Sequence, residues 1–256
     1  MAPIDGTPRF LLLQVRDADD PMREQEVRCF ARSFRCDPGC IEVHDLLSGA
    51  PPGEALERAD VVLLGGSGAY SVVRGGPWLE PALDTMRWLA SQAKPTFASC
   101  WGFQAMARAL GGEVVTDRAR AEVGTTSLTL TSEGEKDPVF APLGRRFDVI
   151  IGHEDVVTRL PPGAVLLASS GLVENEAFRL EGKPIYCTQF HPELCRDDVL
   201  GRIAAYPEYL ALTSASTIDE LATSVPETPH AEELLRRFLD LVARNAAGSL
   251  SPREAS

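Results

Sequence analysis

The sequence predicts an α/β fold in which helices cover both faces of a central, mostly parallel sheet. Two observations lead to this prediction. Apolar runs such as residues 9–15 and 59–66 have no polar alternation, which is typical of strands that are buried on both faces. Segments with apolar residues at helical spacing alternate with most of these runs, and that alternation is the pattern of a parallel sheet.

The N-terminal half supplies the elements of this sheet one after another. Asp20 and Pro21 open a helix as a cap followed by a first-turn proline. Another helix begins at Pro77, and a third is closed by Gly111 and Gly112. The expected order is strand 9–15, helix 20 to about 34, strands 41–46 and 59–66, helix 77 to about 92, strand 94–100 and helix 101–112.

Beyond residue 113 the pattern changes to short strand-like runs that are divided by Gly and Pro. These runs continue to about Phe190 and predict a mostly antiparallel addition that returns to the central sheet. After Glu193, three amphipathic segments predict a helical C-terminal extension. We expect one domain over residues 1–256, with a core at about 8–195, the extension at about 196–247 and a small polar tail, expected to be disordered, at 248–256.

Composition and charge exclude several classes of function. The formal net charge of −12 argues against binding to nucleic acid or to an anionic membrane surface. No apolar run approaches the length of a membrane span. The N-terminus lacks the basic and apolar regions of a secretory signal, so we expect a cytoplasmic protein.

The chain has six cysteines, which the cytoplasm is expected to keep reduced. Cys29, Cys36, Cys40 and His44 offer metal-binding side chains in one stretch, but no CxxC pair occurs there. Structural zinc sites usually show such tightly spaced pairs. We therefore expect no metal site and no cofactor.

Cys100 stands where a buried strand passes directly into a helix. The turn between them would project the thiol above the carboxyl end of the strand, beside the free N–H groups of the helix. Ala98 and Gly102 are small, so the turn can close as in a nucleophile elbow. The A-x-C-x-G pattern alone is weak, because a free cysteine is often only a buried apolar residue.

His191 is the histidine best suited to act as the base for such a thiol. It follows the apolar run 183–190, and Glu193 lies two residues on, so in an extended chain both side chains point the same way. Pro192 keeps His191 out of the helical region. Glu193 could then orient the imidazole. A single H-x-E is usually a surface pair, but Cys100 and His191 together, each after a buried strand, predict a Cys-His-Glu triad.

A glycine-rich turn supplies a third element. Gly65, Gly66 and Gly68 follow the strand that ends near residue 64, and glycines allow close approach of the backbone. The amides of Gly66 and Trp101 could form an oxyanion hole. The alternative is a phosphate-binding loop, but neither G-x-G-x-x-G nor G-x-x-x-x-G-K-[ST] is present.

With these pieces in order, the chain resembles the class I (triad-type) glutamine amidotransferases, in particular stand-alone proteins similar to the glutaminase domain of GMP synthase. The resemblance rests on "LLGGSGAYS", "CWGFQ", "GHEDVVTRLPPGAVLLASS" and "QFHPEL". It implies glutamine as substrate, a thioester on Cys100 and no cofactor. It also implies that Gln104 helps to hold the substrate and that His153 and Asp155 border the glutamine pocket.

Three functions stay open at this point. The first is a glutaminase that delivers ammonia to a separate synthetase or acceptor enzyme, because the roughly sixty residues after Glu193 are too few for an acceptor domain. The second is a hydrolase that uses the same triad on a γ-glutamyl compound. The third is a regulatory or binding protein of the same fold that has no catalysis, which the presence of all three triad residues disfavours.

Overall fold

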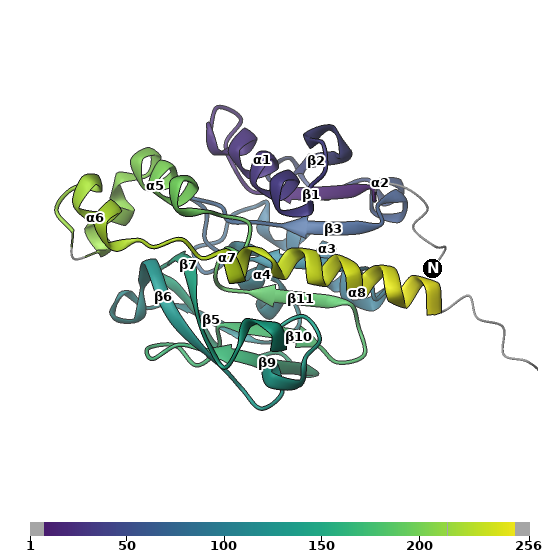
Figure 1. Ribbon diagram of the computed structural model, residues 1–256. Helices are drawn as coiled ribbons and strands as arrows, with labels where there is room; N and C mark the ends of the chain where they lie inside the picture. Colours follow the sequence, from purple (N-terminus) through teal and green to yellow (C-terminus); the bar gives the residue numbers. More distant parts are fainter. Residues whose placement is uncertain (1–7, 214, 249–256) are drawn as a thin grey trace, which may run out of the picture.

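The computed structural model describes residues 8–213 and 215–248, and within them one large sheet runs through the molecule (Figure 1). Its nine strands have the order β2-β1-β3-β4-β11-β10-β9-β6-β7. The first five are parallel: β2 (Ile41–Asp45), β1 (Phe10–Gln14), β3 (Val61–Leu64), β4 (Thr96–Ser99) and β11 (Ile185–Thr188). The predicted α/β fold with a mostly parallel sheet is confirmed.

The remaining strands form the predicted antiparallel addition. They are β10 (Ala177–Leu180), β9 (Ala164–Ser169), β6 (Glu122–Leu130) and β7 (Arg146–His153), each antiparallel to its neighbours. A separate antiparallel pair joins β5 (Glu113–Thr116) and β8 (Asp155–Arg159). β11 therefore returns the chain to the centre of the sheet, next to β4.

Helices pack on both faces, because successive residues of each buried strand point to opposite sides. Leu11 and Leu13 face α3 (Leu79–Ser91) and α4 (Trp101–Ala109), while Phe10 and Leu12 face α1 (Met22–Phe34) and α8 (Leu234–Gly248). A short α2 (Gly53–Arg58) precedes β3. Short 3-10 turns occupy Pro38–Cys40, Leu46–Ser48, Arg118–Arg120, Gly134–Lys136 and Ala141–Leu143.

The chain after residue 195 is helical, as predicted. It forms α5 (Arg196–Ala205), the 3-10 helix η6 (Pro207–Leu212), α6 (Ile218–Ser224), α7 (Pro229–Glu232) and α8. Gly248, the expected start of the tail, is the last residue of α8, and residues 249–256 lie outside the described part of the chain. Among the helices of the described residues, none is long and apolar enough to cross a membrane.

A third apolar cluster fixes the first part of this extension. Val199 and Ile203 of α5 and Leu221 of α6 pack with Cys29 of α1 and Ile150 of β7. In Figure 1 the α5–α6 segment lies at the left of the molecule, on the side toward which the arrows of β3 and β11 point. The extension is thereby held beside the carboxyl ends of the central strands.

We predict that Gly102→Ala destabilises the protein by about 1–3 kcal/mol, as overpacking usually does. A Cβ at Gly102 would lie 2.5 Å from Cβ of Leu64 and 3.2 Å from Cβ of Ala98. Gly53→Ala is the matched control, since a Cβ on that helical glycine meets nothing within 4 Å. The control should be unchanged or up to about 1 kcal/mol more stable. Urea unfolding measures both, and equal effects of the two substitutions would contradict the packing argument.

Candidate functional site

Cys100 occupies the turn between β4 and α4 and has a backbone conformation that few residues other than glycine adopt. Its φ is 52° and its ψ is −105°, and α4 begins at the next residue. The Cys100 N–H donates to the carbonyl of Thr188 at 2.7 Å, and the Cys100 carbonyl accepts from Gln104 N–H at 3.1 Å. These bonds fix the backbone of Cys100 to the carboxyl end of β11 and to the first turn of α4, and so fix the position of the thiol.

His191 and Glu193 follow β11, the parallel neighbour of β4. His191 Nδ1 lies 2.6 Å from Glu193 Oε1, and Glu193 is fully buried. Ser99 Oγ, at the end of β4, donates to the same carboxylate oxygen at 3.2 Å. With Nδ1 occupied, Nε2 is the ring nitrogen left to interact with the Cys100 sulfur, which lies near enough to His191 to affect its pKa. The structure therefore brings the three predicted triad residues together: Glu193 bonds to one ring nitrogen of His191, and Cys100 lies near the ring.

Electrostatics favour the charged form of the His191 imidazole. Burial alone would lower the pKa of His191, but the carboxylate of Glu193 and then the Cys100 sulfur outweigh it and raise the pKa to about 9. Burial would likewise raise the pKa of Glu193, yet His191 and, more weakly, Arg202 hold it below its usual value. The buried pair is thus an ion pair at neutral pH.

Gly66 packs directly against the catalytic candidate His191. A Cβ at this position would lie 2.9 Å from His191 Cε1, so only glycine leaves room for the ring. Gly68, with φ of 66°, faces Tyr206, whose Cζ would lie 2.7 Å from an added Cβ. The hydroxyl of Tyr209 donates to the Gly68 carbonyl at 3.3 Å. The C-terminal extension thus covers the glycine-rich turn after β3.

Gln104, His153 and Asp155 come together on the other side of the thiol. Gln104 Nε2 donates to the Asp155 carbonyl at 3.0 Å and to Gln189 Oε1 at 3.2 Å. His153 Nδ1 lies 3.1 Å from that same carbonyl. The Cys100 thiol donates to the neighbouring Gly152 carbonyl at 3.5 Å. These side chains therefore order the wall of the site by bonding to its backbone.

One cavity of about 350 Å³ collects these groups. Seven of the eight predicted site residues line it, and Glu193 lies behind His191, out of contact with the cavity. The seven are Gly66, Cys100, Trp101, Gln104, His153, Asp155 and His191. The sequence motifs thus meet at the carboxyl edge of the parallel strands, although they are far apart in the chain.

A buried acidic pair beside His153 had no signal in the sequence. Glu122 begins β6, and Glu176 immediately precedes β10, and neither belongs to a motif. Their carboxylate oxygens and a nitrogen of His153 all lie within 4.8 Å of one another, a set that could hold a metal ion. Burial, and then the nearby Glu122 carboxylate, raise the pKa of Glu176 well above its usual value. A proton on Glu176 relieves the repulsion between the two carboxylates without a metal.

Comparison with protein families matches residues 32–197, more than half of the chain, to the model "Glutamine amidotransferase class-I". A glutamine-hydrolysing GMP synthase subunit from Methanothermobacter thermautotrophicus is 36% identical over 48% of this chain and 64% of its own length. The same-named protein from Methanocaldococcus jannaschii is 33% identical over 50% of this chain and 65% of its own length. The chain thus spans just under two thirds of these relatives. The same-named protein from Archaeoglobus fulgidus is 32% identical over 58% of this chain and 74% of its own length.

Solved structures share the fold over nearly the whole chain. A glutamine amidotransferase from Thermotoga maritima superposes with a TM-score of 0.71 at 23% identity, over 93% of this chain and 99% of the other. A glutamine amidotransferase from Methylobacillus flagellatus gives a TM-score of 0.68 at 20% identity, over 97% of both chains. At these identities the likeness concerns the fold.

We predict that Glu176→Gln makes folding less sensitive to alkaline pH. Because its folded pKa is raised above 4.5, the folded protein keeps a proton that the unfolded chain loses. The stability from this group is complete below pH 4.5 and is lost as pH rises through the folded pKa. An amide cannot ionise, so the free energy of unfolding of the variant, relative to the parent, should increase as pH rises above 4.5.

Urea unfolding at a series of pH values measures this difference. Glu181→Gln, at an exposed position, is the control and should follow the parent at every pH. If the difference between Glu176→Gln and the parent stayed constant at every pH above 4.5, a raised pKa of Glu176 would be excluded.

Proposed function

Because the chain belongs to the class-I glutamine amidotransferase family, we propose that it hydrolyses the side-chain amide of glutamine through a thioester on Cys100. One observation carries this proposal above the others. Cys100 stands in a strained strand-to-helix turn and lines the same cavity as His191, whose Nδ1 lies 2.6 Å from Glu193 Oε1. A nucleophile, a base and an orienting carboxylate in hydrogen-bond reach are what nucleophilic catalysis by a thiol requires.

The reaction would proceed in two balanced steps. The Cys100 thiolate attacks the amide carbon, the C–N bond breaks, and ammonia leaves with the proton from His191. Water then attacks the thioester, His191 takes a proton from that water, and the products are glutamate and the free thiol. Glu193 keeps Nδ1 of the ring occupied, so Nε2 performs both proton transfers.

Developing negative charge on the amide oxygen needs hydrogen-bond donors. We assign this role to the backbone N–H groups of Gly66 and Trp101, which both line the cavity beside Cys100. Trp101 is the first residue of α4, so its N–H is among those that the helix leaves without a partner. Loss of one such donor typically reduces the rate about 10²–10³-fold.

The wall made by Gln104, His153 and Asp155 would hold the amino-acid end of glutamine. All three line the cavity; Gln104 and His153 bond to the backbone carbonyl of Asp155, and the Asp155 carboxylate accepts from Ser71 and Thr116. We propose that they fix the shape of this wall while its polar groups contact the substrate. No cofactor enters the mechanism.

Ammonia released at Cys100 would pass to a separate acceptor enzyme. Three relatives of this chain are named as one subunit of a glutamine-hydrolysing GMP synthase, a name that implies at least one further subunit. We extend that division of labour to this protein.

Substitution of the triad tests the proposal directly. We expect Cys100→Ala and His191→Ala each to reduce glutamate release from glutamine by at least about 10³-fold, and to differ by less than about tenfold, since triad residues act as a unit. Glu193→Gln should reduce it less, because the amide still offers the ring a hydrogen-bond acceptor. Steady-state assays with unfolding controls measure these effects. Full activity of Cys100→Ala would refute the thioester mechanism.

The pH profile provides a second test. Because the pKa of His191 is raised to about 9, kcat/KM should fall as pH rises through about 9, where the ring loses the proton that ammonia needs. The charge of Glu193 is the largest cause that raises this pKa, so Glu193→Gln should shift the fall to lower pH. The assay is glutamate release at low glutamine concentration. An alkaline limb at the same pH in parent and variant would contradict the pairing.

A further inference from the structure

Part of the cavity wall comes from residues outside the segment that matches the family model. The match covers residues 32–197, whereas Arg16 precedes it and Arg202, Tyr206 and Tyr209 follow it, and all four line the cavity with Cys100 and His191. This second wall, defined by those four residues, therefore lies outside the segment that matches the family model. Two arginines and two tyrosines have the chemistry of an anion-binding surface.

Arg202 is buried but incompletely paired. It is 7% exposed, and its Nε donates to the neutral amide oxygen of Gln25 at 2.9 Å. Its Nη2 forms an ion pair with Glu26 Oε1 at 3.9 Å, beyond hydrogen-bond distance, and has no hydrogen-bond partner among the described residues. A buried guanidinium with unused donors is unfavourable unless a ligand accepts from it.

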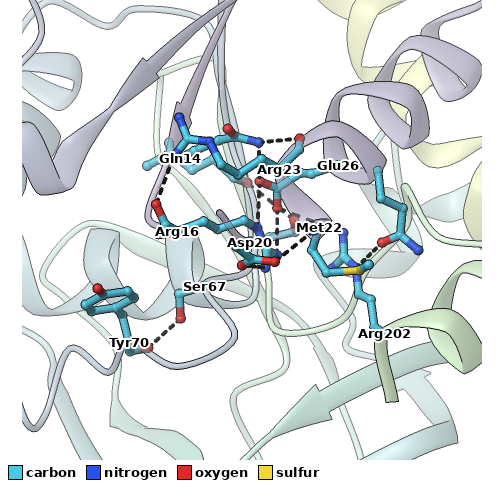
Figure 2. A network of polar contacts seen from close by, with 12 residues as sticks. Gln14, Arg16, Asp20, Met22, Arg23, Glu26, Ser67, Tyr70 and Arg202 are labelled. Atoms are coloured by element: carbon cyan, nitrogen blue, oxygen red, sulfur yellow. Dashed lines mark hydrogen bonds and ion pairs between the residues drawn. The ribbon is translucent and has the colours of Figure 1, made fainter. Parts of the chain in front are cut away.

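Glu26 gives Arg202 only this long ion pair, while it bonds to Arg16 through both of its oxygens. Arg16 Nε and Nη2 donate to Glu26 Oε2 and Oε1 at 3.3 Å each, and Gln14 Nε2 donates to Oε2 at 3.0 Å. Figure 2 shows this network between the end of β1 and α1, with Arg202 at its edge. Arg16 is also bonded to Asp20 and to the Tyr206 hydroxyl, at 3.2 and 2.8 Å. Arg202 is thus the cation of this wall with donors to spare.

Arg202 lies on the same side of the cavity as His191. A Cβ on Gly66 would lie 2.9 Å from His191 Cε1 and 3.7 Å from Arg202 Nη1, so the ring and the guanidinium pack on the same side of Gly66. In the proposed mechanism the leaving amine faces His191, which gives it a proton. The side of the cavity next to Arg202 is therefore the side of the leaving group.

We propose that Arg202 binds a carboxylate on the leaving amine, so that the preferred substrates are γ-glutamyl amides of amino acids rather than glutamine alone. This inference rests on the proposed thiol mechanism and deepens it. The Cys100 thiolate attacks the γ-carbonyl carbon, the C–N bond breaks, and the amino acid leaves with the proton from His191. Water hydrolyses the thioester to glutamate, so the atoms balance without a further reactant.

Two amides of nearly the same shape test the inference. γ-Glutamylglycine carries the carboxylate, and γ-glutamylpropylamide has an ethyl group in its place. A hydrogen bond to a charged group accounts for about a 10- to 100-fold difference, so kcat/KM of the parent should favour γ-glutamylglycine by about that factor. A parent enzyme that hydrolyses both equally would overturn the inference without any variant.

Substitution of Arg202 tests whether this residue causes the preference between the two amides. In R202Q the preference for γ-glutamylglycine should shrink to within about threefold of unity. Because Arg202 also holds down the pKa of Glu193, the kcat/KM of each amide is divided by that of glutamine, and this normalised value should fall for γ-glutamylglycine and stay within about threefold of the parent for γ-glutamylpropylamide. An equal loss on glutamine and on both amides would show that Arg202 acts on the glutamyl part or on the triad, and would refute the assignment. R118Q is the control, since the exposed Arg118 lines the same cavity and pairs with Glu154 at 3.5 Å.

The outcomes separate this inference from the proposed function. Hydrolysis of glutamine without preference between the two amides rejects the carboxylate site alone. Absence of hydrolysis of all three compounds by the folded parent rejects the thioester mechanism itself. If R202Q does not fold, R202K keeps the charge without the planar fork, and its preference for γ-glutamylglycine should fall below that of the parent.

Discussion

The site depends on one backbone constraint, the left-handed conformation of Cys100 between β4 and α4. A residue with a Cβ in such a region typically carries about 1–3 kcal/mol of strain, which the surrounding structure must hold. Here β4 lies between two parallel neighbours, β3 and β11, and the Cys100 N–H is bonded to Thr188. Gly102 lets α4 approach Leu64 of β3 closely enough to close the turn. The thiol consequently projects at the edge where His191 and Gly66 also emerge.

Charge forms the second layer of organisation. Glu193 is buried beside the imidazole of His191, and the charge of Arg202 also lowers its pKa. Arg202 in turn lies 3.9 Å from Glu26, which accepts a hydrogen bond from Arg16. The proposed catalytic pair is thereby coupled through buried charges to the N-terminal strand and to the C-terminal extension. In a chain with a net charge of −12, the cavity wall nevertheless carries four arginines, Arg16, Arg74, Arg118 and Arg202, beside the acidic Glu154, Asp155 and Glu208. The extension thus takes part in the electrostatics of the site as well as in its shape.

Patterns within short stretches of sequence predicted the buried strands and the two motifs at their ends. Unbroken apolar runs predicted the parallel strands, and the A-x-C-x-G and H-P-E patterns led to Cys100 and His191 because strand ends in a parallel sheet share an edge. The buried pair Glu122 and Glu176 could not be predicted, since their approach depends on β6 and β10 in the antiparallel addition. The same holds for Arg202, whose partners Gln25 and Glu26 lie far from it in the sequence.

The most direct test of the account is to map the adduct of a glutamine-analogue diazoketone by peptide mass spectrometry. Burial raises the thiol pKa of Cys29, Cys36, Cys187 and Cys195, which leaves little of their reactive thiolate form at neutral pH. Cys100 has the His191 ring beside it and the cavity in front of it. The account predicts one adduct, on Cys100, that glutamine suppresses. An adduct on another cysteine, with the Cys100 peptide unmodified, would contradict it.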